Sequence, residues 1–72
     1  MPSAVMSKDE ADARSIRTNL NRAGARLSFR EHVYQGRPGI MLAGRDVKGR
    51  RVRIWGDWPY MVNSIIGLTA DA

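Results

Sequence analysis

Three runs of alternating apolar and polar residues, separated by turns rich in glycine, occupy the middle of the chain. They cover Arg26 to Gln35, Ile40 to Arg45 and Arg50 to Trp55. Residues 36–39 (Gly-Arg-Pro-Gly) are expected to form the first turn and residues 46–49 (Asp-Val-Lys-Gly) the second, because Gly, Pro and Asp favour tight turns. Short runs at this spacing predict a three-stranded antiparallel sheet.

One helix is predicted before the sheet region in the sequence and another after it. Ser7 to Glu10 has the S-x-x-E form of a capping box, which predicts a helix from about Lys8 to Ala23, stopped by Gly24. Asp57 is expected to cap a second, apolar helix with a proline in its first turn, and a C-terminal strand is the alternative. The fold class is therefore α+β, in the order α-β-β-β-α.

The length and the absence of cysteine limit the class of protein. A chain of 72 residues holds one hydrophobic core, so we expect a flexible lead-in over residues 1–6 and a single domain over residues 7–72. Without cysteine there is no disulfide, which favours a reducing cytoplasm. No apolar run approaches the roughly 20 residues that span a bilayer, and no signal peptide is apparent, so no membrane location is expected.

The alternation divides the side chains of the sheet between two faces. Glu31 breaks the pattern by falling on the apolar side, so a bulge or an edge position is expected there. The residues expected to face the helices are Leu27, Phe29, Val33, Ile40, Leu42, Val52 and Ile54. Those expected on the opposite face are Arg30, His32, Tyr34, Met41, Ala43, Arg45, Arg51, Arg53 and Trp55.

Positive charge is concentrated in this sheet region. Residues 26–53 carry eight cations against two anions, a net charge of +6, whereas the net charge of the whole chain is +5. Seven of the eight cations are arginines. Arginine binds phosphate and carboxylate through two parallel hydrogen bonds, and aromatic rings stack on bases. We therefore predict a nucleic-acid-binding face made of Arg30, Tyr34, Arg37, Arg45, Arg51, Arg53 and Trp55.

The predicted first turn contains one short motif that resembles a known DNA-binding element. Residues 35–38 (Gln-Gly-Arg-Pro) resemble the Q/R-G-R core of the AT-hook-like loops of bacterial nucleoid silencers, which implies insertion of Arg37 into an A-T minor groove. Glycine and proline are also ordinary residues of a hairpin turn. The spacing G-x-x-G at residues 36–39 is that of KH domains as well, but it falls between strands and is discarded.

A longer stretch, Tyr34 to Trp58, resembles the DNA readers of the Apetala and integrase-arm type, which have three strands and a helix. The shared elements are Tyr34-x-Gly36, Arg45-Asp46, Gly49-x-Arg51-Val52 and Gly56-x-Trp58. The resemblance covers about a third of the chain and departs from that family in its first turn, in Trp55 and in the added N-terminal helix. It implies that the sheet lies in the major groove, with Arg51, Arg53 and Trp55 in contact. The element order is also that of double-stranded RNA-binding domains, without their lysine-rich last helix.

The composition disfavours catalysis. His32 is the only histidine and there is no cysteine, so neither an enzyme nor a cofactor or metal site is expected.

We expect a small DNA-binding regulatory protein, with RNA as the less favoured nucleic acid. The alternative is a small modulator of phage or plasmid type that grips an acidic surface of a host enzyme with the same face. A homodimer contact through Trp58 to Leu68 is left open.

Overall fold

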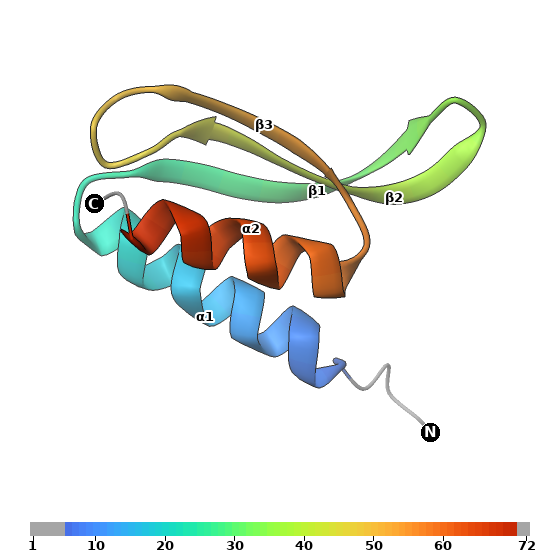
Figure 1. The fold of residues 1–72 in the computed structure, drawn as a ribbon, viewed down its shortest axis with the longest axis horizontal. Coiled ribbons are helices and arrows are strands. Elements are labelled where there is room, and N and C mark those ends of the chain that lie inside the picture. The colour runs from blue at the N-terminus through green and yellow to red at the C-terminus, as the bar shows by residue number, and fades with distance from the viewer. Residues whose placement is uncertain (1–5, 71–72) are drawn as a thin grey trace.

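The computed structural model describes residues 6–70, which form two helices and one sheet (Figure 1). The fold is α+β in the predicted order, and the alternative of a C-terminal strand is wrong because that segment is helical. The lead-in predicted for residues 1–6 falls outside the described residues except for Met6. The elements are α1 (Lys8–Arg22), β1 (Arg26–Tyr34), β2 (Arg37–Arg45), β3 (Arg51–Gly56) and α2 (Trp58–Ala70).

The three strands form an antiparallel sheet in the order β1-β2-β3, with β2 in the centre. Pairing between β1 and β2 runs without interruption from Arg26 opposite Arg45 to Tyr34 opposite Arg37, one residue against one. The bulge considered at Glu31 is therefore absent. The edge position is the correct alternative, because β1 is an edge strand and the Glu31 side chain is exposed.

The first turn is shorter and earlier than predicted. Gln35 and Gly36 alone connect β1 to β2, with φ of 53° and 76°, the left-handed conformation that two-residue hairpins require. The prediction of a turn over residues 36–39 is wrong, since Pro38 lies within β2. Strand β3 pairs with β2 only from Ile40 onward, so Pro38 stands in a two-stranded ribbon where its missing N–H costs no bond to β3.

Both helices lie side by side on one face of the sheet (Figure 1). Leu42 of the central strand and Met61 and Ile65 of α2 are fully buried between the two layers. None of the helices in residues 6–70 combines the length and the apolar character needed to cross a bilayer. The buried core consists of Ala13, Leu20, Ala25, Leu27, Leu42, Val52, Met61 and Ile65.

The β1–β2 hairpin extends past the helices, at the right of Figure 1. Val33 lies on the side of the sheet predicted to face the helices, but 63% of its surface is exposed, so the prediction that it packs in the core is wrong. Ile40 is half-buried and does pack against the core. Val33 and Ile40 differ because the helices do not reach the end of the hairpin. The alternation predicts the face on which a residue lies, but not how far along the sheet the helices extend.

Local hydrogen bonds set the helix ends. Ser7 Oγ accepts from the Glu10 N–H at 3.1 Å, while the Glu10 carboxylate accepts from Arg14 Nε at 2.8 Å, so only half of the capping box forms. At the other end the Gly24 N–H donates to Asn21 O and the Ala25 N–H to Leu20 O, with φ of 114° at Gly24. This is the Schellman arrangement, and it confirms Gly24 as the stop of α1.

Asn21 attaches the end of α1 to the start of β1. Its Oδ1 accepts from the Leu27 N–H at 2.9 Å, and its Nδ2 donates to the Leu27 carbonyl at 3.0 Å. The side-chain amide thus satisfies both backbone groups of Leu27 on the free edge of the sheet, as a neighbouring strand would. This contact joins the helix layer to the sheet in one fixed register.

Replacing Asn21 with Ala is expected to lower the free energy of unfolding by about 1–3 kcal/mol, because two half-buried backbone groups lose their partners. Urea denaturation followed by circular dichroism measures the change. Asn19→Ala is the matched control, since Asn19 lies on the same helix with an exposed side chain, and its effect should stay within about 0.5 kcal/mol. Equal effects of the two variants would contradict the role given to Asn21.

Candidate nucleic-acid interface

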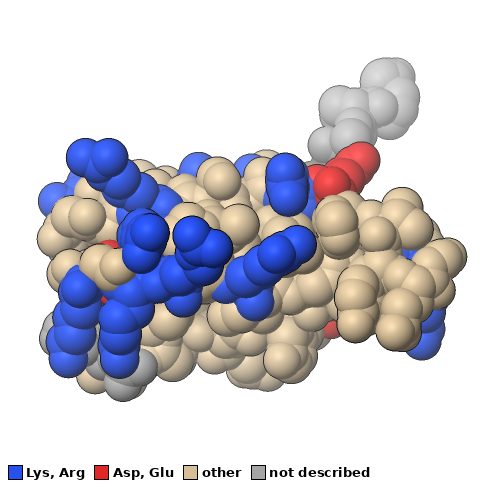
Figure 2. Space-filling view, turned by 90° about the horizontal axis from the view of Figure 1, so that it is seen from above, with Lys and Arg blue, Asp and Glu red and all other residues tan. Residues whose placement is uncertain are grey.

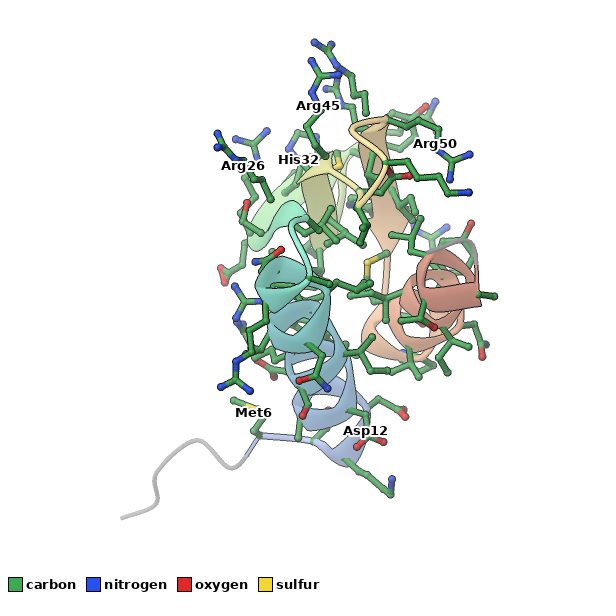
Figure 3. All side chains as sticks on the ribbon, turned by 90° about the vertical axis from the view of Figure 1, so that its left-hand side faces the viewer. Met6, Asp12, Arg26, His32, Arg45 and Arg50 are labelled. Carbon is green, nitrogen blue, oxygen red and sulfur yellow. The ribbon has the colours of Figure 1, made fainter. Side chains whose placement is uncertain are left out.

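The pairing register brings the predicted arginines and aromatic residues onto one face of the sheet. In both strand pairs the partners are directly opposite, so alternate residues of all three strands share the side away from the helices. Figure 3 shows Arg26 and Arg45 pointing away from the two helices. We call this side the outer face; it comprises Arg26, Ser28, Arg30, His32, Tyr34, Arg37, Gly39, Met41, Ala43, Arg45, Arg51, Arg53 and Trp55.

Three arginines lie in one row across the strands. Arg26 pairs with Arg45, and Arg45 pairs with Arg51, so the row (hereafter the arginine row) places like charges directly opposite each other. Such an arrangement destabilises a sheet unless counter-charge is supplied. Within residues 6–70 no carboxylate forms an ion pair with the arginine row or with Arg30 and Arg53. Figure 2 shows the resulting cluster of positive side chains at one end of the outer face.

The β2–β3 turn, residues 46–50, holds this end of the sheet in place. The buried Asp46 side chain accepts from the Lys48 N–H at 3.0 Å and from the Arg50 N–H at 2.8 Å, and its Oδ2 pairs with Arg50 Nε at 2.9 Å. Arg45 Nη1 donates to the Gly49 carbonyl at 3.2 Å. The predicted turn over residues 46–49 is confirmed, and it fixes the two residues that flank it, Arg45 and Arg51.

The same contacts shift the pKa of Asp46 below its ordinary value of 3.8. Burial of the carboxylate acts the other way and would raise it. The hydrogen bonds donated by the backbone and side chain of Arg50, the positive charge of Arg50 and the hydrogen bond from Lys48 together outweigh burial and lower the pKa. The ionised form of Asp46 is thus the one that stabilises the turn.

Aromatic residues occupy the other end of the outer face. The Trp55 indole reaches from β3 across β2, its Nε1 donates to the His32 carbonyl on β1 at 3.0 Å, and its ring centre lies 5.5 Å from that of Tyr34. A Cβ added to Gly39 would lie 2.6 Å from Cε2 of the indole, so only glycine leaves room for this crossing. The prediction that Trp55 points to the outer face is confirmed, but the side chain is half-buried and its one hydrogen-bond donor is occupied.

An open depression of about 340 Å³ lies beside the indole on the outer face. Met41, only 4% exposed, is the one buried residue among its lining side chains, and Arg53 also borders it. We call this the indole pocket, lined by His32, Tyr34, Met41, Arg53 and Trp55.

The structure places all seven predicted site residues on the outer face, five of them where all three strands pair and two, Tyr34 and Arg37, beside the hairpin turn. Arg30, Arg45, Arg51, Arg53 and Trp55 lie in the part of the outer face where all three strands pair. Arg37 lies opposite Tyr34 beside the hairpin turn, at the far end from the arginine row. It is the first residue of β2, directly after the two-residue turn, so residues 35–38 form an ordinary hairpin connection.

Sequence reasoning missed Arg26 and the crossing of Trp55. Arg26 begins β1 and lies four residues before Arg30, so the alternation places both side chains on the same face. The bond from Trp55 to His32 joins residues 23 positions apart and has no signal in the local pattern. Trp58, the other tryptophan, is partly buried against the core and packs edge-to-face on Phe29 at 5.0 Å.

Neither a metal centre nor a known relative assigns a function. No cluster of three or more His, Cys, Asp or Glu side chains that could hold a metal ion occurs in the part of the chain from Met6 to Ala70. No protein-family model, curated protein or solved structure matches the chain significantly. The geometry and charge of the outer face therefore carry the functional argument.

The pH dependence of stability should report the Asp46 contacts. Because the pKa of Asp46 is lower in the folded chain than its ordinary 3.8, its contribution is present above that pH and is lost as the pH falls through the folded value. Asp46→Asn keeps an oxygen acceptor for the turn but removes the charge. Urea midpoints of the two proteins should differ at about pH 7, and the difference should shrink as the pH falls below 3.8 and through the folded pKa of Asp46. A gap that persists unchanged in acid would contradict this assignment.

Proposed function

We propose that this protein binds nucleic acid through the outer face of its sheet and acts as a small regulatory protein, with DNA favoured over RNA. The observation that carries the proposal is the arginine row, in which Arg26, Arg45 and Arg51 lie opposite one another without a carboxylate partner in residues 6–70. A polyanion supplies the missing counter-charge at regular intervals. The preference for DNA rests on the resemblance of residues 34–58 to three-stranded DNA readers.

Binding, not catalysis, is the activity that this face supports. Its cations are arginines, which remain protonated at any physiological pH and therefore serve for charge and hydrogen bonding and not for proton transfer. His32 is the only histidine in the chain, and there is no cysteine to act as a nucleophile. The arginines hold phosphates, while the aromatic end contacts sugar or base.

The second candidate partner is an acidic protein surface bound by the same face. One observation favours it: Tyr60, 54% exposed, lines a depression together with Arg37 and Trp55, so an apolar contact borders the cationic surface. Arginine and aromatic residues are also the commonest energetic centres of protein interfaces. Pull-down before and after nuclease treatment separates the two candidates, because a stoichiometric protein that survives nuclease supports this one.

The affinity for a short DNA duplex should depend steeply on salt. If the outer face contacts four or five phosphates, the logarithm of the association constant should fall with the logarithm of salt concentration at a slope of about −4. Fluorescence anisotropy titrations across a series of salt concentrations measure the slope. A flat response would rule out the proposed phosphate contacts.

Replacing Arg51 and Arg53 together with Ala should reduce that slope to about −2 and weaken binding at least tenfold. Both side chains are exposed on an edge strand, so the stability of the fold should change by less than about 0.5 kcal/mol. The control variant, Lys8→Ala with Arg22→Ala, removes the same charge from exposed positions on α1. If control and test variants weaken binding equally, net charge and not the outer face is responsible.

A further inference from the structure

The orientation of the Trp55 indole limits what it can recognise. Indole has a single hydrogen-bond donor, and in this structure that donor is bonded to the His32 carbonyl. The surface left to a ligand is the ring itself, which can stack but cannot read the polar edge of a base pair. Trp55 lines the indole pocket and also the depression next to Arg37, so the ring is approachable from more than one side.

We propose that the indole pocket takes one unpaired nucleobase, and hence that the outer face binds a single strand in preference to a duplex. This inference rests on the proposed function and names the form of its ligand. The pocket is of the size and character that small flat ligands fill, with buried Met41, the rings of Trp55, Tyr34 and His32, and the guanidinium of Arg53 at hand for the attached phosphate.

A duplex does not make use of such a site. In a double helix each base is covered on both faces by its stacked neighbours, so proteins read the edges of bases through hydrogen bonds in the grooves. An aromatic ring without a free donor gains nothing from those edges. Unpaired bases expose their faces, and stacking on a protein ring contributes about 1–3 kcal/mol per base.

The outward residues of β3 can follow the backbone of a nucleic-acid strand. Arg51, Arg53 and Trp55 are alternate residues on one face of the strand, so they recur about every 6.6 Å. That is about twice the 3.4 Å rise per nucleotide of a stacked strand. A strand laid along β3 therefore meets an outward residue at about every second nucleotide if it is stacked, and at every nucleotide if it is stretched.

The first test leaves the protein unchanged. Anisotropy titrations at one salt concentration compare a labelled single strand of mixed sequence, the same strand annealed to its complement, and the same strand with abasic sites throughout. We expect the intact single strand to bind more tightly than the duplex and about five- to 150-fold more tightly than the abasic strand. Equal binding of intact and abasic strands, or a duplex bound as tightly as the single strand, overturns this inference and leaves the proposed function standing. Absence of binding to all three overturns both.

Protein variants then locate the base. Trp55→Leu should weaken binding of the intact strand at least fivefold without changing binding of the abasic strand, whereas Trp55→Phe, which still stacks, should retain most of the affinity. Gly39→Ala, which forces the indole to move, should behave as Trp55→Leu does while leaving the Trp55 side chain present. Ile66→Ala is the control, an exposed apolar side chain on α2 that lines neither the indole pocket nor the depression beside Arg37. Intact-strand affinity that is unaffected by both Trp55→Leu and Gly39→Ala overturns the assignment of the pocket.

Discussion

Uninterrupted one-to-one pairing across β1, β2 and β3 determines which side chains of the sheet are buried and which are exposed. Because successive side chains of a strand point to opposite faces, a slip of one residue would exchange the buried and exposed sets completely. Three features fix this register. They are the two-residue turn at Gln35 and Gly36, the turn stabilised by hydrogen bonds to Asp46, and the hydrogen bonds between the Asn21 side-chain amide and the backbone of Leu27. Leu42, fully buried in the central strand, adds a penalty for any slip.

The same pairing gives the outer face two ends of different chemistry. At one end the arginine row places like charges opposite one another, which destabilises the sheet. At the other end Trp55 spans the sheet to His32 over Gly39 and leaves an apolar hollow above Met41. Arg53 lies between them, on the strand that carries members of both. A nucleic-acid strand laid along β3 would meet charge and ring surface in turn.

Much of this arrangement could be predicted from the sequence because alternation depends on parity and not on the ends of the strands. The first turn was misplaced, yet Met41 and Leu42 still fell on the correct faces. Pro38 and Gly39 misled the prediction because they are frequent in turns, whereas here Pro38 lies beyond the reach of β3 and Gly39 makes room for Trp55. Contacts between distant residues, such as Asn21 with Leu27 across a helix end and Trp55 with His32 across the sheet, leave no periodic signal.

An NMR titration shows whether the outer face is the surface that contacts nucleic acid. Backbone amide shifts of the protein would be followed while an unlabelled single-stranded DNA is added. We expect changes concentrated at Arg45, Arg51, Arg53 and Trp55, with the amides along α1 unchanged. Shift changes concentrated on α1 and α2, or no change at saturating DNA, would contradict it.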